Sequence, residues 1–341
     1  MKAIVLTRHG ADKEAFEIRE VATPEPAAGQ VRIAVEGFGL NYADVSARQG
    51  TYQDAPPLPS IIGYEVVGRV DKLGPDVTGP ALGQRVAALT RFGGYATMAL
   101  TDVRAVVAIP DDMEFGIAAA LPTQGCTAYY CAEEMVRLYP GDHVLVQAAA
   151  GGVGTLLVQL AKRRGCVVYG TAGSDQKLGY LRDIGVDHPI NYRTQDFAEA
   201  VRKIRGNEGL DVIFDSLGGS AVRKGLALLG AGGRMICFGA AEREAGSFQI
   251  LRDLKFVASF GVPHPIPWLM SSKGLIGVNM LRIADNRPLT LKRCMEGVVD
   301  LALKGELKPV VGGRYKATQI AEAHEFLGGR ASTGKVVVSW D

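Results

Sequence analysis

The sequence lacks the features that are typical of secreted, zinc-ribbon or membrane-spanning chains. Only five cysteines occur among 341 residues, none precedes Cys126, and no two form a CxxC pair. Such an odd and scattered set predicts reduced thiols in a protein core rather than a disulfide framework. No apolar run approaches the roughly 20 residues that an α-helix needs to cross a bilayer.

An excess of charge of one sign is lacking as well. Lys and Arg number 38 and Asp and Glu 36, so the formal net charge is only +2, whereas nucleic-acid-binding proteins usually carry a basic excess or stripe. Residues 1–8 form too short an apolar stretch for a secretory signal and hold no small-residue cleavage site. With 47% hydrophobic and 22% charged residues, the composition is that of a folded globular protein. We expect a soluble, cytoplasmic protein.

Glycine, by contrast, is abundant, with 43 residues, or about one in eight against an average near 7%. Up to about Thr123 the apolar runs are short and are interrupted by glycine and proline. Residues 31–35, 65–70 and 84–89 are examples. Short alternating runs between turn residues predict an all-β unit of barrel-like form.

From about Gly125 the pattern changes to a regular alternation of strands and helices. Residues 152–164 carry apolar side chains at helical spacing, and Ser174 and Asp175 are suited to begin a second helix that runs to about Ile184. Apolar strands are predicted at 143–148, 166–170, 190–192, 211–214 and 235–238. Strands separated by helices of this length predict an α/β fold with a doubly wound parallel sheet.

The pattern loosens again after about Pro263. A further strand is predicted at 274–280, a helix at 291–303 and a final strand at 334–340. Because a lone terminal strand must pair with a sheet, we expect it to join the N-terminal β unit. The sheet domain would then be inserted in a discontinuous barrel domain, with boundaries at 1–124, 125–264 and 265–341.

Residues 148–154, AAAGGVG, lie between a predicted strand and a predicted helix. They fit the dinucleotide fingerprint G-x-G-x-x-G, with Ala149 in the place of the first glycine. Gly151 would let the backbone approach a pyrophosphate, and Gly154 would let the helix pack against its strand. The helix N-terminus would offer N–H groups and positive partial charge to the phosphates. This context predicts a dinucleotide site.

The choice of dinucleotide depends on the end of the second strand. NAD sites place an acid about 20 residues after the glycine loop, but residues 169–173 hold none. Ser174, Lys177 and the pair Tyr192-Arg193 would suit a 2′-phosphate, because a hydroxyl and two cations can satisfy a doubly charged oxyanion. Asp175 leaves the alternative open, since it could begin a helix or bind the ribose hydroxyl of NADH. We predict NADPH.

Residues 40–50, LNYADVSARQG, resemble the signature N-[FY]-x-D-x-x-x-R-x-G of the zinc-free quinone-oxidoreductase branch of the medium-chain dehydrogenase/reductase superfamily. The glycine loop is similar to the AAAGGVG of that branch, and residues 188–192 and 216–219 are most similar to its vesicle-amine-transport-protein-like members. The resemblance covers essentially the whole chain. It implies a Rossmann-type sheet inserted in a GroES-like barrel domain, with the active site between them. It also implies homodimers joined through the strand at 274–280.

Carried over motif by motif, the resemblance assigns expected contacts to individual residues. The cofactor contacts would be Thr127, Gly151, Gly152, Val153, Ser174, Lys177, Tyr192, Ser216, Phe238, Gly239 and Asn279. Thr127 and the last four would lie on the nicotinamide side, with Ser332 or Lys335 nearby. The substrate would face Asn41, Tyr42 and Tyr52. Gln124 stands where some relatives carry a lysine, so a role for that cation does not carry over.

A metal site is not expected. Zinc alcohol dehydrogenases of the superfamily use a cysteine and a Gly-His-Glu triplet, and a catalytic zinc needs three Cys, His or carboxylate ligands. Here the triplet is Gly63-Tyr64-Glu65, and Asn41 stands where a thiolate would be required. The five histidines are scattered singly.

Without a metal to stabilise an alkoxide, alcohol oxidation is disfavoured, and reduction of an electron-poor acceptor is favoured. Asn41 and a tyrosine hydroxyl could stabilise the enolate or hydroquinone anion that forms. Tyr52 and Tyr64 are candidate proton donors, although either could be packing only. We predict hydride transfer from NADPH to a quinone or α,β-unsaturated carbonyl. The main alternative is a nucleotide-binding protein with a structural or partner-binding role and little catalysis.

Overall fold

The computed structural model describes residues 1–241, 255, 258–260 and 265–340. Contacts within the chain divide it into two compact units. Unit 1 comprises residues 1–126 and 280–341, and unit 2 comprises residues 127–279. The middle of the sequence therefore forms one unit, and its two ends together form the other.

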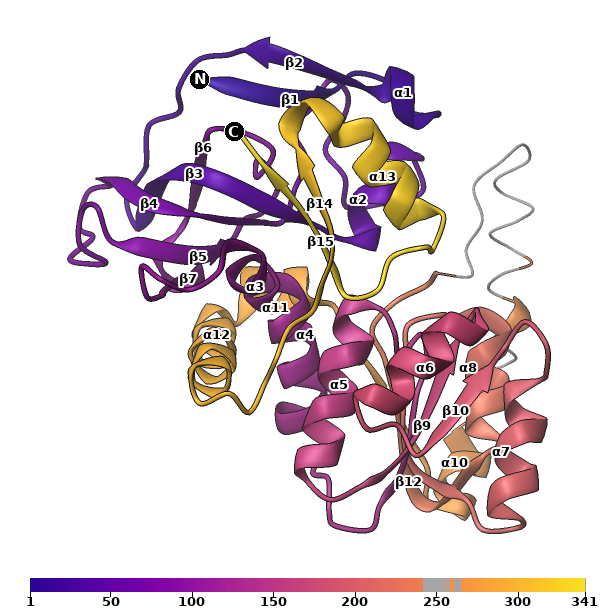
Figure 1. Cartoon of the computed structure of the whole chain (residues 1–341). Coiled ribbons are helices and arrows are strands. Elements are labelled where there is room, and N and C mark those ends of the chain that lie inside the picture. The colour runs from indigo at the N-terminus through magenta and orange to yellow at the C-terminus, as the bar shows by residue number, and fades with distance from the viewer. Residues whose placement is uncertain (242–254, 256–257, 261–264, 341) are drawn as a thin grey trace. The chain divides into compact units, whose positions relative to one another are not determined.

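Unit 2 is built on a six-stranded parallel sheet (Figure 1). Its strands are β8 (His143–Val146), β9 (Val167–Ala172), β10 (His188–Asn191), β11 (Leu210–Asp215), β12 (Leu229–Cys237) and β13 (Gly274–Gly277). Their spatial order, β10-β9-β8-β11-β12-β13, is the 3-2-1-4-5-6 order of a Rossmann fold. The predicted doubly wound sheet is confirmed. The last strand is shorter than the predicted 274–280: it ends at Gly277, and Met280 begins a helix.

Helices connect these parallel strands. They are α5 (Gly152–Arg163), α6 (Asp175–Asp183), α7 (Phe197–Arg205), α8 (Gly219–Leu226) and α10 (Pro265–Ser271). The strands are mostly buried and rich in Val, Ile and Leu, as expected when helices cover a parallel sheet. Leu145, Tyr169 and Ile213 lie at the centre of the resulting core. The predicted helices at 152–164 and at 174–184 are confirmed to within one residue.

Unit 1 contains a seven-stranded, mostly antiparallel sheet and a separate two-stranded sheet. The larger sheet consists of β3 (Gln30–Leu40), β4 (Glu65–Leu73), β5 (Arg85–Leu89), β6 (Met98–Asp102), β7 (Val106–Ala108), β14 (Val311–Lys316) and β15 (Lys335–Ser339). The smaller sheet pairs β1 (Lys2–Leu6) with β2 (Phe16–Glu20). The helices are α1 (Asp12–Ala15), α2 (Tyr42–Arg48), α3 (Phe115–Ala119), α11 (Met280–Asn286), α12 (Pro288–Leu303) and α13 (Ile320–Gly328).

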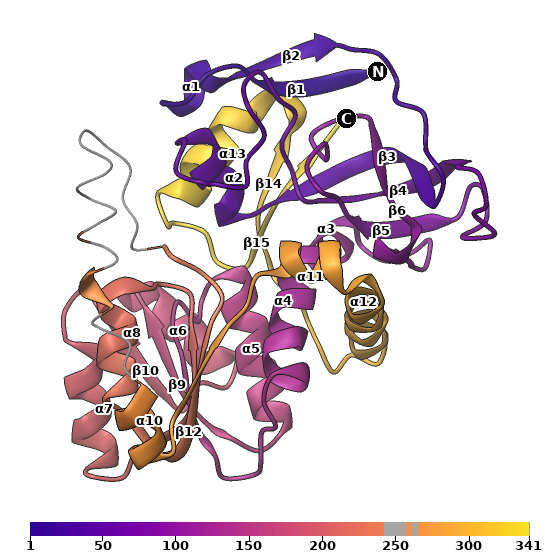
Figure 2. The same cartoon turned by 180° about the vertical axis from the view of Figure 1, so that it is seen from behind.

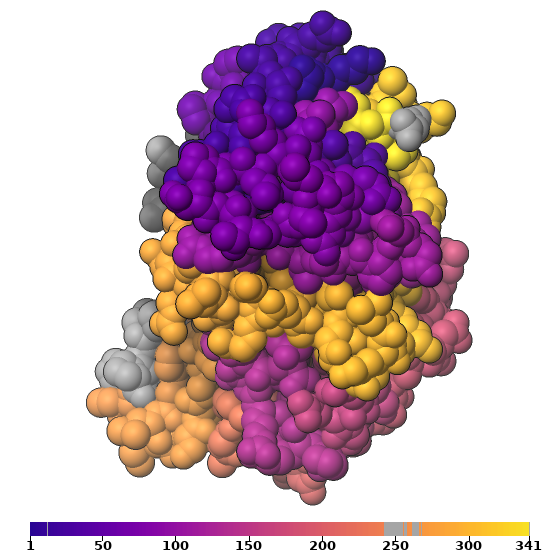
Figure 3. Space-filling view, turned by 90° about the vertical axis from the view of Figure 1, so that its left-hand side faces the viewer, coloured from indigo at the N-terminus to yellow at the C-terminus, as the bar shows by residue number. Residues whose placement is uncertain are grey.

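The C-terminal strand completes the N-terminal sheet. β15 pairs antiparallel with β3, in a register that sets Val336 opposite Leu40 and Val338 opposite Phe38. Figures 1 and 2 show the yellow strand β15 beside β3, and Figure 3 shows the C-terminal residues at the surface next to the indigo N-terminal part of the same unit. The predicted pairing of the last strand with the N-terminal β unit is confirmed.

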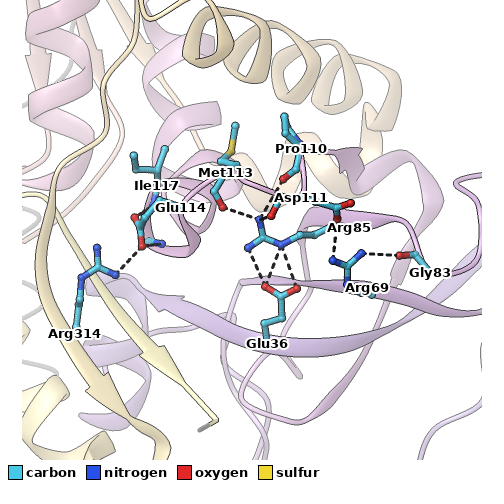
Figure 4. Close-up of polar contacts among 11 residues, drawn as sticks. Glu36, Arg69, Gly83, Arg85, Pro110, Asp111, Met113, Glu114, Ile117 and Arg314 are labelled. Carbon is cyan, nitrogen blue, oxygen red and sulfur yellow. Dashed lines mark hydrogen bonds and ion pairs between the residues drawn. The ribbon is translucent and has the colours of Figure 1, made fainter.

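A buried arginine ties the larger sheet to the loop that precedes α3 (Figure 4). Arg85 of β5 is only 7% exposed and donates to both carboxylate oxygens of Glu36 on β3, at 2.9–3.1 Å. Its remaining guanidinium nitrogen donates to the carbonyl oxygens of Pro110, Asp111 and Met113. Arg85 therefore holds this loop against β5.

Candidate active site

The glycine loop of unit 2 adopts the expected strand-to-helix turn. It follows β8, and Ala148 takes the left-handed conformation with φ of 50°. A Cβ atom on Gly154 would lie 2.4 Å from the carbonyl oxygen of Ala148 and 2.7 Å from Cα of Ala149. Helix α5 can therefore pack against the loop only with glycine at this position, as predicted. At Gly151 a Cβ would meet only the oxygen of Ala148, at 3.2 Å, so the fold itself does not demand glycine there.

The start of α5 offers free backbone donors. Its first intrahelical hydrogen bond runs from the N–H of Thr155 to the oxygen of Gly151, at 2.8 Å, and no side chain caps the helix. The amides of Gly152, Val153 and Gly154 precede this bond, in the turn where helical N–H groups lack intrahelical acceptors. Together with the helix dipole they can bind an anion such as a pyrophosphate.

Several predicted cofactor residues gather at the same edge of the sheet. In the observed strand order, the switch point lies between β8 and β11, outside their carboxyl ends. Ser216 follows β11, and Phe238 and Gly239 follow β12. A Cβ on Gly239 would lie 2.6 Å from the oxygen of Ser216, so these two backbones are in close contact. Asn279 follows β13 at the corresponding end.

The predicted adenosine side is also assembled from neighbouring strand ends. Ser174 caps α6, and its hydroxyl accepts from the N–H of Lys177 at 3.3 Å. A Cβ on Gly173 would lie 2.5 Å from the hydroxyl of Tyr192 and 3.4 Å from Nε of Arg193. Burial, and then the charge of Arg193, lower the pKa of Lys177. The two cations and the tyrosine hydroxyl therefore lie around the end of β9, as a phosphate site requires.

Asp175, which the sequence left ambiguous, has an internal partner. Its Oδ1 accepts from the side-chain amide of Asn191 at 2.8 Å. One carboxylate oxygen thus joins the ends of α6 and β10. Thr127, the remaining predicted cofactor residue, is buried in the short helix α4 (Cys126–Tyr129). Unlike the others, it precedes the first strand of the parallel sheet in the sequence.

In unit 1, Asn41 lies at the centre of a buried polar network. Its backbone N–H donates to Oδ2 of Asp44 at 2.8 Å, which forms the cap of α2. Its side-chain Nδ2 donates to Oε1 of Glu65 at 2.8 Å, and its Oδ1 accepts from Nζ of Lys335 at 3.0 Å. Lys335 also contacts Glu65 directly, and the other carboxylate oxygen of Glu65 accepts from the N–H of Thr123.

Burial shapes the electrostatics of this network. Glu65, Lys335 and Asp44 are fully buried, whereas Asn41 retains 7% exposure. Desolvation lowers the pKa of Lys335, and the charge of Glu65 opposes that shift. Desolvation also raises the pKa of Asp44 to about 7, against the backbone hydrogen bond from Asn41, which lowers it. The sequence did not predict the link between Glu65 and Lys335, because 270 residues separate them.

Tyr52 and Tyr64 lie together beside this network. Their rings meet edge to face with centroids 6.1 Å apart, and Tyr64 also packs against Phe92 at 5.1 Å. Burial raises the pKa of both tyrosines, and the carboxylate of Asp44 contributes to both shifts. Both hydroxyls therefore stay protonated at neutral pH, and each can donate a hydrogen bond.

The residues of unit 1 do not fit a catalytic zinc. Within the described ranges, no three His, Cys, Asp or Glu side chains lie close enough together to hold a metal ion. Glu65, the one conventional ligand of the expected triplet, is bonded to Lys335, Asn41 and Thr123. Tyr64 occupies the position of the histidine.

Two protein-family models match the chain. A model described as "Alcohol dehydrogenase GroES-like domain" matches residues 27–111, and one described as "Zinc-binding dehydrogenase" matches residues 152–270. The first range lies in unit 1 and the second in unit 2. The expected GroES-like and Rossmann domains are thereby confirmed.

Individual proteins are similar over the whole chain. A "Synaptic vesicle membrane protein VAT-1 homolog" of Danio rerio is 35% identical over 342 residues, covering 99% of this chain and 70% of that protein. A "2-haloacrylate reductase" of Burkholderia sp is 32% identical over 345 residues, covering 99% and 98%. The crystal structure of Escherichia coli quinone oxidoreductase complexed with NADPH has a TM-score of 0.86 at 27% identity, covering 99% of this chain and 100% of that one.

The chain belongs to the medium-chain dehydrogenase/reductase superfamily and is an oxidoreductase of that family. The similarity to quinone oxidoreductases and to VAT-1 homologues, inferred above from short motifs, is confirmed. Among the described residues, no helix combines the length and the apolarity that crossing a membrane would require.

Proposed function

We propose that this oxidoreductase transfers hydride from NADPH to a quinone or an α,β-unsaturated carbonyl, independently of zinc. One observation carries the proposal: where a catalytic zinc would be bound, unit 1 holds neutral donors and an internally paired carboxylate. Asn41 and Tyr52 can donate hydrogen bonds there, and Glu65 is bonded to Lys335. Two relatives support this substrate class, since the Burkholderia protein is named a 2-haloacrylate reductase and the Escherichia coli protein a quinone oxidoreductase.

The residues of unit 2 fit NADPH. The amides of Gly152 and Val153 would bind the pyrophosphate, and Lys177, Tyr192 and Arg193 would bind the 2′-phosphate. Asp175 is bonded to Asn191, which favours the phosphate over a free ribose hydroxyl. Thr127, Ser216, Phe238, Gly239 and Asn279 are proposed for the nicotinamide side. When bound, NADPH supplies the hydride.

Unit 1 would stabilise the charge that forms on the acceptor. Hydride addition to an enone or quinone places negative charge on the carbonyl oxygen of the acceptor, as an enolate or hydroquinone anion. Asn41 and Tyr52 donate to that oxygen, and fixed donors of this kind stabilise developing charge without reorganising. Tyr52, which is protonated at neutral pH and partly exposed, then donates the proton that completes the reduction and takes one back from solvent.

The test is NADPH oxidation, followed at 340 nm, with 9,10-phenanthrenequinone and a panel of enones including 2-haloacrylates. We expect turnover with at least one of these acceptors by protein that is free of zinc in elemental analysis. NADPH binding without turnover across the whole panel would support the alternative of a nucleotide-binding protein. Activity that chelators remove and zinc restores would refute the metal-free proposal.

We also propose a homodimer joined through β13. This strand lies at the end of the sheet, with Leu275 partly exposed, and α10 nearby in the sequence exposes Ile266, Leu269 and Met270. An apolar surface beside a strand edge is typical of a subunit interface. Light scattering should give twice the chain mass, and Leu275→Arg should give monomers. Cytoplasmic location stays a prediction, which cell fractionation would test.

A further inference from the structure

The ion pair of Glu65 and Lys335 is fully buried, with both side chains at 0% exposure. Taking two charges out of water costs several kcal/mol per ion, and an apolar pair of similar size is often as stable or more so. The pair is therefore poorly explained by stability alone. Its contacts with Asn41 suggest another role.

Each end of the Asn41 amide meets one member of the pair. Oδ1 accepts from the ammonium of Lys335 at 3.0 Å, and Nδ2 donates to the carboxylate of Glu65 at 2.8 Å. The flipped amide would set its oxygen against the carboxylate and its NH₂ group against the ammonium, so only one orientation is stable. The ammonium on Oδ1 also polarises the amide and strengthens its N–H donors.

This orientation of the Asn41 amide fixes the direction of its second N–H group. A side-chain amide carries two N–H groups, and the single hydrogen bond from Nδ2 to Oε1 of Glu65 uses one of them. The second N–H lies in the same rigid plane. Asn41 is also the member of the group that keeps some exposure, at 7%, whereas both charges have none.

The backbone is adapted to this arrangement. A Cβ atom on Gly39 of β3 would lie 2.2 Å from Cε of Lys335 and 2.5 Å from Oε1 of Glu65. The lysine side chain therefore crosses the strand where a residue other than glycine would block it. The pairing of β15 with β3 brings Lys335 to this point.

We propose that Lys335 is a positioning residue for the reduction and acts through Asn41. It holds the Asn41 amide so that the second N–H is presented to the carbonyl oxygen of the acceptor. It also neutralises Glu65, so that no uncompensated carboxylate opposes the charge developing on that oxygen. This inference rests on the proposed function, because it needs an acceptor that is reduced beside Asn41.

The test is a double-mutant cycle with Asn41→Ala and Lys335→Met. With an acceptor that the wild type reduces, we expect Asn41→Ala to lower kcat about 100-fold, as for the loss of one oxyanion donor. Lys335→Met should lower kcat at least 10-fold, and the double variant should be no slower than Asn41→Ala within about threefold. The Kd for NADPH should stay within twofold. Losses that multiply would overturn the proposal, since Lys335 would then act independently of Asn41.

Arg85→Met provides the control, because it breaks another ion pair of unit 1, between the buried Arg85 and the partly exposed Glu36 (Figure 4). It should lower the melting temperature and leave kcat within about twofold. An equal loss of kcat in Arg85→Met would show that the Lys335 effect is general destabilisation, and would overturn the proposal. If Lys335→Met does not fold, Lys335→Gln, which keeps an N–H donor, replaces it in the cycle.

A second readout needs no cofactor. The side-chain NH₂ resonances of Asn41, identified by their loss in Asn41→Ala, should shift in Lys335→Met and stay in place in Arg85→Met. Unchanged resonances in Lys335→Met would refute the positioning role even if kcat falls. Absence of turnover by the wild type would instead refute the proposed function, and the positioning role with it.

Discussion

The pH dependence of the unfolding free energy offers a test that does not depend on the reaction. It rests on Asp44 and His324, two buried titratable residues that both interact with Tyr95. The hydroxyl of Tyr95 lies 3.1 Å from Nε2 of His324, and Asp44 interacts with the same hydroxyl. Burial raises the pKa of Asp44 to about 7, and it lowers the pKa of His324 to about 3, with a further contribution from Arg48. In the native protein both groups are therefore uncharged over most of the acid range.

The two shifts act on stability in opposite directions. Because the pKa of Asp44 is raised above its unfolded value of 3.8, its contribution is present at low pH and is lost as the pH rises towards 7. Because the pKa of His324 is lowered below 6.5, its contribution is present above pH 6.5 and is lost as the pH falls towards 3. Between about pH 4 and 6.5 each state holds one proton on this pair, so the slopes cancel.

Substituting either residue should expose the pH dependence of stability that cancels in the wild type. Relative to the wild type, Asp44→Asn should gain stability with rising pH, by roughly 1 kcal/mol per pH unit and about 3 kcal/mol between pH 4 and 6.5. His324→Gln should lose stability over the same interval at the same rate. The double variant should again run parallel to the wild type. The opposite signs distinguish proton linkage from a uniform loss of packing.

The assay is urea unfolding at 25 °C from pH 4 to 6.5 in a Trp268→Phe background. Trp340 then reports on unit 1, where its indole donates to the oxygen of Ala96 at 3.1 Å and packs on Phe38. Profiles of Asp44→Asn and the wild type that differ by a constant amount at every pH would refute the reasoning. The native pKa values would then be close to the unfolded ones.

Three further predictions concern the two candidate sites. Lys177→Ala should raise the Kd for NADPH about 10-fold or more and leave that for NADH within twofold; equal losses in a fluorescence titration would favour NADH. Gly151→Val should keep the melting temperature within a few degrees but abolish NADPH binding. Gly154→Val should instead unfold unit 2, because its Cβ would lie 2.4 Å from the oxygen of Ala148. Equal melting temperatures of the two variants would contradict this prediction. Gly39→Ala should lower the melting temperature and kcat together, and a crystal structure should show the displaced lysine.

The sequence predicted those parts of the molecule that depend on neighbouring residues. Strand and helix periodicity, the glycine loop and the Ser174 cap are local, since each is set within one turn or one strand. Even Gly154 could be assigned its packing role, because the fingerprint spacing places a glycine where the helix packs against its strand.

Other features could not be predicted because they depend on side chains that only the fold brings together. Asp175 is a plausible ribose ligand by position, and only the fold shows that one of its carboxylate oxygens is bonded to Asn191, 16 residues away. The cluster of Asp44, Tyr95 and His324 likewise spans the chain, with 229 residues between the tyrosine and the histidine.

Local sequence patterns were enough to predict the two fold classes, the discontinuous arrangement of the chain and the presence of a dinucleotide loop. The folded chain, in contrast, was needed to show that Lys335 is the charge partner of Glu65 and that both bind Asn41. The physical reason is that a buried charge is stable only beside a partner. The register of β15 on β3 sets which residue becomes that partner. These two strands come from opposite ends of the chain, and no local periodicity in the sequence predicts their register.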